Sequence, residues 1–501
     1  MTHSISRRSF LMSASAAAAL LPTAGCANAP DRSLRPISRA DDLLKASQPS
    51  VNELISAAQL GGVVGVSVAD LATGDVLEQN EASKGLPPAS VAKALTAAYA
   101  LAHLGGGYRF QTRVLTTSGV ANGVVDGDLV LAGSGDPTLD TDGLAGLAKQ
   151  LAAAGVREVR GGLKLWGGAL PHVAEIDTAQ PEHVGYNPAV SGLNLNYNRV
   201  HFEWRKTGSS YSVTMDARSA SYRPDVRMAR MSVEPRSAPI YTYSDAGAWD
   251  QWTVARNALG GAGARWLPVR KPELYAGEVF QSFLRAEGIS VAAIEVVDRL
   301  PTNVVELARI ESAALTDVLR DMLKWSTNLT AEVVGMTATA ARTGRRPASL
   351  VASAKELNAW AAERLGVRGI ALVDHSGLGD RSRVSAADMM AALAAIHRDI
   401  ALRPLLKAFE MRDAQGRRIK NHPIDVAAKT GTLNFVSGLA GFAELPDGRT
   451  VVFAIFAADL DRRNALSVEE RERPPGGAAW NRRAKTLQQK LIERWGVMYA
   501  A

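Results

Sequence analysis

The chain of 501 residues contains a single cysteine, Cys26, and only eight histidines. One cysteine excludes an intramolecular disulfide and a zinc site built from several thiolates. The sequence also contains no H-E-x-x-H, no G-x-S-x-G and no Walker loop, which leaves zinc-peptidase, nucleophile-elbow and P-loop nucleotide chemistry without support. We therefore expect no metal and no cofactor.

The chain also lacks a strong excess of charge of either sign, because its 57 Lys and Arg are nearly balanced by 50 Asp and Glu. The formal net charge of +7 favours an ordinary solvated surface, with weak attraction to an anionic cell wall as the alternative. No block of Lys and Arg interleaved with aromatic residues indicates nucleic-acid binding. At 47% apolar and 21% charged residues, the composition is that of a globular protein too long for one hydrophobic core.

Long hydrophobic runs are absent beyond residue 30, where none approaches the ~18 residues of a transmembrane helix. The N-terminus has its own pattern. Residues 6–11 (SRRSFL) form a twin-arginine motif, and the apolar stretch at 10–21 is 12 residues long, too short to span a bilayer. Residues 1–29 are therefore predicted to be a twin-arginine signal peptide, and the mature protein is predicted to be exported.

Cys26 lies inside this segment. Residues 23–26 read T-A-G-C and resemble a bacterial lipobox, although that motif prefers Leu where Thr23 stands. Cleavage after Ala29 by the A-x-A rule is the alternative, which Pro30 would hinder. We favour lipidation of Cys26, which would attach the protein to the membrane; otherwise Cys26 is discarded with the signal peptide.

Three short motifs follow one another in the mature chain, and any one of them alone recurs by chance. Pro87-Pro88 precedes Ser90, the serine of the first motif, and apolar residues at helical spacing follow it. Ser90 is therefore predicted in the first turn of a helix. Residues three apart share a helix face, which places Lys93 beside Ser90. The motifs are Ser90-x-x-Lys93, Ser326-x-Asn328 and Lys429-Thr430-Gly431.

The spacing of the first motif suits acyl transfer. A serine hydroxyl is a poor nucleophile at neutral pH and needs an adjacent base. Lys93 can be that base only if its pKa falls, which burial and a second cation, Lys429, both promote. Free N–H groups at the start of a helix favour developing negative charge. The inferred reaction is attack of Ser90 on a peptide carbonyl, followed by an acyl-enzyme and its hydrolysis.

The motifs, in the contexts PASVAKAL, WSTNLTAE and AAKTGTL, resemble those of penicillin-binding enzymes. The likeness is to the D-alanyl-D-alanine carboxypeptidase/endopeptidase family, the low-molecular-mass class C penicillin-binding proteins (peptidase family S13). Linking segments at 107–112 (GYRFQT), 133–137 (GSGDP) and 374–378 (DHSGL) match as well. His375 stands where the family usually has a small residue, and the family's usual phrase before K-T-G is not recognisable at 411–425.

The resemblance implies an α+β fold: a penicillin-binding/serine β-lactamase-like transpeptidase domain, with an antiparallel sheet flanked by helices, and inserted β-rich accessory domains. It implies a periplasmic serine D-Ala-D-Ala carboxypeptidase, with D-alanyl endopeptidase action as a second activity. Its partners would be peptidoglycan stem peptides, and β-lactam antibiotics would acylate Ser90. The N–H groups of Ser90 and Thr432 would form the oxyanion hole. A serine β-lactamase and a catalytically silent cell-wall-binding lipoprotein are the alternatives.

The resemblance also implies roles for the other motif residues. Ser326 would relay a proton to the leaving amine, and Asn328 would hydrogen-bond the substrate. Lys429 and Thr430 would hold the terminal carboxylate of D-Ala. Gly431 would let the strand approach the substrate closely.

Ser90 and Ser326 are 236 positions apart, so the chain is predicted to leave the catalytic domain and return. The interval contains short β-like runs punctuated by Gly and Pro. We predict an inserted accessory region at 107–268 and a discontinuous catalytic domain formed by 31–106 and 269–501.

Patterning predicts several further elements. A hairpin turn at Thr73-Gly74 joins strands at 63–68 and 75–77. Residues 325–328 are predicted to form a loop between two helices, and Ser385 is predicted to cap a helix that extends to His397. Later elements are strands at 426–431, 439–443 and 450–455, and a helix over 480–495 that packs on their sheet.

Overall fold

The structure, a computed structural model, describes residues 39–413 and 415–500, with side chains from residue 43 on. The predicted signal peptide and Cys26 lie outside the described residues. Helix α1 (Arg39–Ala46) belongs to an N-terminal unit that ends at Gln48, and every other element belongs to a second unit that begins at Pro49. Among the described residues, none of the helices combines the length and hydropathy of a membrane span.

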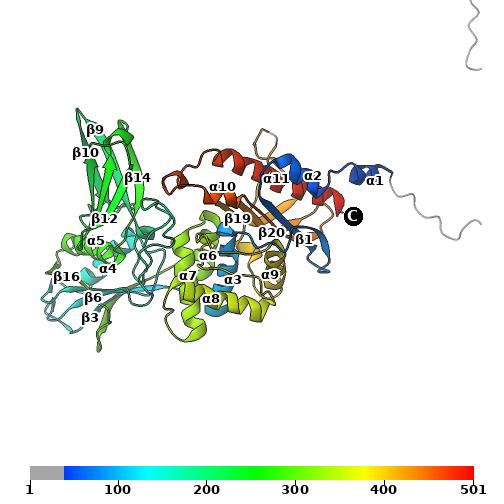
Figure 1. Cartoon of the computed structure of the whole chain (residues 1–501). Coiled ribbons are helices and arrows are strands. Elements are labelled where there is room, and N and C mark those ends of the chain that lie inside the picture. The colour runs from blue at the N-terminus through cyan, green and yellow to red at the C-terminus, as the bar shows by residue number, and fades with distance from the viewer. Residues whose placement is uncertain (1–38, 414, 501) are drawn as a thin grey trace, which may run out of the picture. The chain divides into compact units, whose positions relative to one another are not determined.

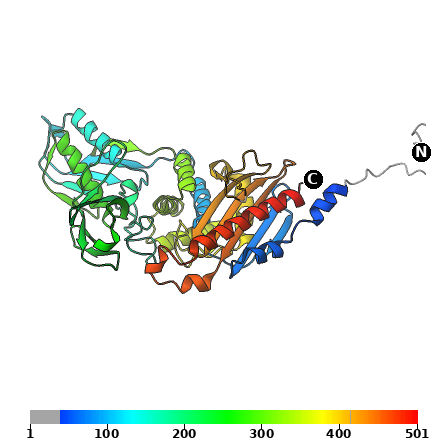
Figure 2. The same cartoon turned by 90° about the horizontal axis from the view of Figure 1, so that it is seen from above.

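A six-stranded antiparallel sheet organises the second unit (Figures 1 and 2). In order across the sheet, its strands are β18 (Lys407–Ala408), β19 (Asp425–Leu433), β20 (Val436–Glu444), β21 (Thr450–Ala458), β1 (Val63–Asp70) and β2 (Val76–Asn80). The hairpin predicted at Thr73-Gly74 is confirmed as β1–β2, and the strands predicted at 439–443 and 450–455 pair as β20 and β21. Because β20 and β21 are buried along almost their whole length, both faces of the sheet are covered.

One face of the sheet is covered by α2 (Val51–Ala58) and α11 (Gly477–Met498) (Figure 2). Ser50 and Glu53 form a capping box at the start of α2, which satisfies backbone donors there. Packing of the predicted C-terminal helix on the sheet is confirmed. The buried stripe of α11 recurs every three or four residues, at Trp480, Ala484, Leu487, Leu491 and Trp495.

The other face carries a layer of helices, and together they enclose an extensive apolar core. These helices are α3 (Ala92–Leu104), α6 (Leu315–Trp325), α7 (Asn328–Thr343), α8 (Leu350–Trp360) and α9 (Ala386–Asp399). The side chain of Ser385 accepts a hydrogen bond from Asp388 N, which confirms the predicted cap of α9. A short α10 (Leu460–Asn464) follows β21. Helices on both faces of an antiparallel sheet confirm the predicted fold class.

The chain between α3 and α6 builds a second apolar core. Its main sheet, in spatial order, contains β16 (Ile294–Val296), β8 (Leu163–Trp166), β6 (Leu129–Gly133), β3 (Gln111–Thr116) and β17 (Val305–Glu311). The helices α4 (Thr141–Ala153) and α5 (Pro272–Ala286) pack with it. Two three-stranded sheets also contribute to this core: β10 (Ser210–Asp216), β9 (Arg199–Thr207) and β14 (Ala262–Pro268); and β11 (Ala229–Glu234), β13 (Asp250–Ala255) and β12 (Tyr241–Asp245). A four-stranded sheet of two-residue strands adds β15 (Ser290–Val291), β7 (Glu158–Val159), β5 (Val124–Val125) and β4 (Val120–Ala121).

The second core extends further along the chain than the predicted insertion. Strand β17 pairs with β3, and β16 pairs with β8, although β16 and β17 follow residue 268. The chain returns beside the point where it left, because Phe110 N donates to Ser312 Oγ at 3.0 Å and Ser312 N donates to Phe110 O at 2.9 Å. We therefore propose 107–312 as the inserted region in place of 107–268. The sequence pattern of α5 shows that one side of this helix is buried. It does not show which of the two cores buries that side.

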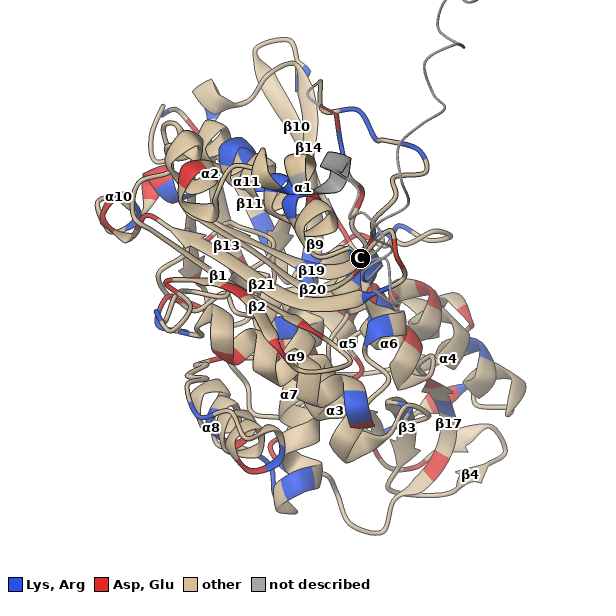
Figure 3. Ribbon diagram, turned by 90° about the vertical axis from the view of Figure 1, so that its right-hand side faces the viewer, with Lys and Arg blue, Asp and Glu red and all other residues tan. Residues whose placement is uncertain are grey.

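Acidic and basic residues are interspersed over the helices and loops, whereas the central strands of the six-stranded sheet carry almost none (Figure 3). Exposed ion pairs such as Arg320–Asp317 contribute little to stability. This distribution is that of a solvated surface.

The apolar stripe of α11 yields a stability prediction. Trp495 is fully buried, its ring packs on Phe453 at 5.4 Å between centroids, and its Nε1 donates to Glu78 Oε2 at 2.9 Å. Trp495→Ala should lower the free energy of unfolding by about 3–5 kcal/mol, measured in guanidinium. Trp325→Ala, at a tryptophan that is 67% exposed, is the matched control and should cost less than about 1 kcal/mol. Equal losses in both variants would contradict the packing of α11.

Candidate active site

Ser90 lies in a short turn that leads into α3. This turn (Ala89–Val91) is a 3₁₀ helix, and α3 continues from Ala92, so the predicted position at a helix start is confirmed. Ala89 has φ +47°, a strained conformation for a residue with a Cβ and one that is typical of functional sites. Ala89, Val91 and Ala92 are fully buried. The turn is therefore fixed in the core, while Ser90 remains partly exposed.

Lys93 is fully buried beside Ser90. Its Nζ donates to Ser90 Oγ at 3.0 Å, to Asn328 Oδ1 at 2.7 Å and to Ser376 O at 2.8 Å. Burial lowers the pKa of Lys93 to about 8, although two nearby buried carboxylates act to raise it. A lysine with this pKa can exchange a proton with a serine hydroxyl near neutral pH.

Ser326 and Asn328 lie where α6 ends and α7 begins, which confirms the predicted interhelical loop. Ser326 caps α6 in the left-handed region at φ +60°, and its Oγ accepts a hydrogen bond from Lys429 Nζ at 3.1 Å. Asn328 accepts from Lys93 through Oδ1 and donates through Nδ2 to Tyr186 O at 2.9 Å. Both polar ends of its amide are therefore used.

Lys429 projects from β19 and is 2% exposed. Its Nζ also donates to Thr430 O at 2.8 Å. Burial lowers the pKa of Lys429 to about 6, and the charges of Lys93 and Lys407 act in the same direction. Lys429 therefore loses its proton far more readily than an exposed lysine does. A carboxylate bound beside it would raise its pKa and draw in a proton.

Strand β19 passes close to the turn of Ser90, and Gly431 permits that approach. A Cβ on Gly431 would lie 2.7 Å from Pro88 O and 3.1 Å from Ser90 N. Thr432 lines the cleft, and Thr430 is exposed. The sequence assigned Gly431 to close approach of the substrate; the structure adds close approach of the nucleophile's own turn.

Ser90, Ser326 and Asn328 of the first two motifs line a cleft of about 300 Å³, together with Thr432, which follows the third motif. Lys93 and Lys429 are buried and do not line it, but Lys93 donates to Ser90 and Asn328 and Lys429 donates to Ser326. The structure thus brings together three motifs that are distant in sequence. The lining residues are Ser90, Ser326, Asn328 and Thr432, together with Gln180, Tyr186, Gly377, Leu378, Leu433, Asn434, Arg463, Arg471, Glu472 and Asn481.

One wall of the cleft comes from the inserted region, through Gln180 and Tyr186. The sequence did not indicate these residues, because the irregular segment that carries them has neither a motif nor a periodic pattern. Besides the contact with Asn328, the segment is held by Arg471, whose Nη1 donates to Ala179 O at 2.5 Å.

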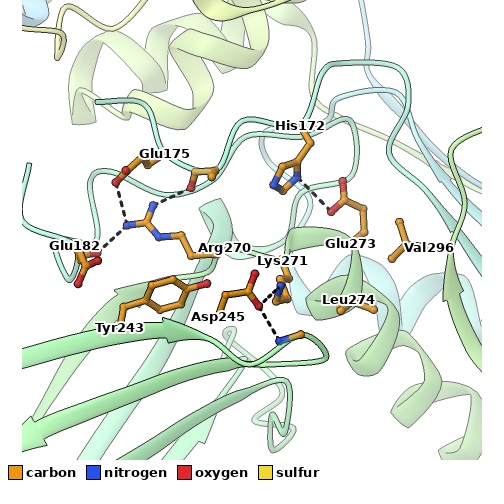
Figure 4. Close-up of a pocket in the computed structure, with 12 residues that line it drawn as sticks. His172, Glu175, Glu182, Tyr243, Asp245, Arg270, Lys271, Glu273, Leu274 and Val296 are labelled. Atoms are coloured by element: carbon orange, nitrogen blue, oxygen red, sulfur yellow. Dashed lines mark hydrogen bonds and ion pairs between the residues drawn. The ribbon is translucent and has the colours of Figure 1, made fainter. Parts of the chain in front are cut away.

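Arg270, which lies just before α5, also holds this segment in place (Figure 4). Its guanidinium is 7% exposed and donates to Ala174 O, Asn187 O and Glu182 O at 2.8–2.9 Å. Glu175 Oε2 lies 3.6 Å from Arg270. A buried guanidinium with carbonyl partners fixes the backbone around it, so the cleft wall has a defined position.

Glu472 joins the inserted region to the segment that precedes α11. Its carboxylate contacts His183 Nε2 at 2.8 Å and accepts from Arg265 at 2.8 Å. The hydrogen bond with His183, and then Arg265, lower the pKa of Glu472 to about 2. Glu472 therefore stays ionised, and because it lines the cleft, this ion-pair cluster forms part of the wall.

The site contains a serine that accepts a hydrogen bond from a buried lysine, next to a second buried lysine on an antiparallel sheet. These are the features of an acylating serine hydrolase with a penicillin-binding type of domain. A model of the D-Ala-D-Ala carboxypeptidase 3 (S13) family matches residues 47–472. The chain belongs to this family, and its enzyme class is that of the D-Ala-D-Ala carboxypeptidases, which are peptide hydrolases.

Individual relatives agree with this assignment. The chain is 30% identical over 423 residues to the D-alanyl-D-alanine carboxypeptidase of Actinomadura sp. (strain R39), covering 77% of this chain and 76% of that protein. It is 24% identical over 432 residues to D-alanyl-D-alanine carboxypeptidase DacB of Haemophilus influenzae, covering 81% and 88%. The crystal structure of penicillin binding protein 4 (dacB) from H. influenzae superposes with a TM-score of 0.72 at 21% identity, covering 89% and 100%. This last likeness confirms the fold.

The approach of β19 to the nucleophile can be tested by adding one methyl group. Gly431→Ala should slow acylation of Ser90 by benzylpenicillin about 10²-fold, because the new Cβ displaces the strand from the turn. The rate is read from intact mass at timed intervals. Gly146→Ala is the matched control, since a Cβ at that position in α4 meets no atom within 4 Å. Acylation of Gly431→Ala at the wild-type rate would rule out the tight approach.

Proposed function

We propose that this enzyme removes the terminal D-alanine from D-Ala-D-Ala stem peptides of peptidoglycan through an acyl-enzyme on Ser90. The observation that carries the proposal is the 3.0 Å contact between Ser90 Oγ and the buried amine of Lys93, whose pKa is lowered to about 8. A base of this strength, held against the hydroxyl, is what serine activation requires.

In the proposed reaction, Lys93 takes the proton of Ser90 as Oγ attacks the carbonyl carbon of the penultimate D-Ala. The N–H groups of Ser90 and Thr432 stabilise the oxyanion. Ser326, whose Oγ accepts a hydrogen bond from Lys429 at 3.1 Å, gives its proton to the departing amine as the C–N bond breaks and is reprotonated with the proton that Lys93 took from Ser90. Water then attacks the Ser90 ester and gives one proton to Lys93. The ester bond breaks, and Ser90 takes that proton from Lys93.

We assign the terminal carboxylate of the substrate to Lys429 and Thr430. Carboxylate binding would restore the positive charge that burial disfavours on Lys429, so substrate binding and proton uptake are coupled. Asn328 orients Lys93, and an amide of the substrate competes with Tyr186 O for Asn328 Nδ2. Gly431 keeps β19 close to both the substrate and the nucleophile.

The same acylation chemistry extends to β-lactams and to D-alanyl cross-links. Penicillin binding protein 4 of H. influenzae has been solved in complex with a novel β-lactam, and we propose β-lactams as covalent inhibitors at Ser90 here. Cleavage of D-alanyl cross-links is proposed as a second activity of the cleft. Export by the twin-arginine signal to the periplasm, with lipid attachment at Cys26, is proposed from the sequence of residues 1–29.

Intact mass after incubation with benzylpenicillin tests the proposal. Wild-type enzyme should gain one equivalent of adduct, Ser90→Ala should gain none, and wild type should release D-Ala from a pentapeptide. Rapid turnover of benzylpenicillin without D-Ala release would favour a β-lactamase. An adduct that persists in Ser90→Ala, or binding to sacculi with no D-Ala released, contradicts the proposed function.

A further inference from the structure

Two buried carboxylates beside Lys93 have no role in the reaction described above. Glu332 of α7 is fully buried and Asp374, in the loop after α8, is 1% exposed. Burying a carboxylate is costly unless hydrogen bonds or charges compensate it. The partners of these two side chains therefore indicate what they do.

Both carboxylates bind the backbone of the loop 374–379. Glu332 accepts from His375 N at 2.9 Å and from Ser376 N at 2.8 Å. Asp374 accepts from Gly377 N at 2.7 Å and from Gly379 N at 2.5 Å. The peptide units on both sides of Ser376 are thus each held by a carboxylate.

The carbonyl of Ser376 is the group that contacts Lys93, with Nζ donating to it at 2.8 Å. Gly377 N belongs to the same peptide unit as this carbonyl, so Asp374 holds the far side of the unit that Lys93 binds. Gly377 has no room to move toward the nucleophile's turn, since a Cβ on it would lie 1.9 Å from Ala89 O. Small displacements of this loop would therefore reach both Lys93 and the turn of Ser90.

A neutral contact holds the same loop. Thr96 Oγ1 of α3 donates to His375 O at 2.7 Å. The ring of His375 occupies the space beside Gly335, where a Cβ would lie 2.1 Å from its Cγ, and its Nε2 lies 2.7 Å from Ser353 Oγ. The His375 departure from the family pattern is thus accommodated by Gly335 and Ser353.

We propose that Glu332 and Asp374 are positioning residues for the reaction. They fix the peptide units around Ser376 so that the Ser376 carbonyl keeps the amine of Lys93 against Ser90. Their negative charges also stabilise the protonated form of Lys93. This inference rests on the proposed function, because it assigns these carboxylates to the base of that mechanism.

The titratable groups around Lys93 come from several elements. Burial, and the charge of Asp374, raise the pKa of Glu332; burial also raises the pKa of Asp374. Burial lowers the pKa of His375 to about 3, so its ring is uncharged. Both carboxylates raise the pKa of Lys93, and these groups titrate together. The charges that act on this cluster include Lys429 of β19, which itself feels Lys93 and Lys407, and Asp177 of the inserted region, which acts on Asp374.

The test is the pH dependence of acylation by benzylpenicillin in Glu332→Gln. An amide keeps only one acceptor oxygen, so one peptide unit is released and the rate at the pH optimum should fall about 10²-fold. Removing the carboxylate also removes a group that favours protonated Lys93. The acid limb of the rate profile should therefore move to lower pH, by on the order of one unit.

Two controls separate this role from a purely structural one. Thr96→Val loosens the same loop without removing a charge, so its rate should fall while its acid limb stays in place. Asp216→Asn removes a buried carboxylate of the second core that pairs with Arg218 and should leave the profile unchanged. If Glu332→Gln does not fold, Asp374→Asn is measured in its place with the same expectations.

An unshifted acid limb in the folded variant, or a wild-type rate at the optimum, overturns the inference. The proposed function is tested separately with Ser90→Ala. If that variant forms no adduct, acylation at Ser90 is supported whether or not Glu332→Gln behaves as expected.

Discussion

Burial of the Lys93 amine is the constraint on which the rest of the site depends. A buried lysine is costly unless its donors are satisfied, and its three acceptors are Ser90 Oγ, Asn328 Oδ1 and Ser376 O. These acceptors lie in the turn before α3, at the start of α7 and in the loop after α8. Satisfying one amine therefore requires three distant parts of the chain to converge, and the same burial lowers the pKa of Lys93 to a value useful for catalysis.

The inserted region makes the cleft more than a bare catalytic surface. Tyr186 O accepts from Asn328, and Arg471 and Arg270 hold the segment around it at two separate points. Glu472 adds an ion-pair contact with His183 and Arg265 that also lines the cleft. This segment of the inserted region, which supplies Gln180 and Tyr186 to the cleft, thus packs Val173 and Ile176 against the first core and is fastened there by hydrogen bonds.

The sequence predicted the chemistry better than the surroundings. Ser90 beside Lys93, the interhelical position of Ser326 and the sheet that carries Lys429 follow from local spacing and patterning, and all are present. Gln180 and Tyr186 could not be predicted, because their position depends on long-range contacts of an irregular segment. The end that we propose for the insertion could not be predicted either, because the apolar pattern of α5 is the same whichever core buries it. The role of Glu332 could not be predicted either, because the sequence shows only a polar residue in a helix and not its partners His375 N and Ser376 N.

The pKa of Lys93 itself can be measured by NMR titration of enzyme labelled at the lysine ε-carbon, with its signal assigned by comparison with Lys93→Arg. We expect a lysine signal that titrates near pH 8 and is lost in Lys93→Arg. Titration of Lys93 near the ordinary value of about 10.4 would contradict it, because a lysine that is fully charged at neutral pH cannot accept the proton of Ser90.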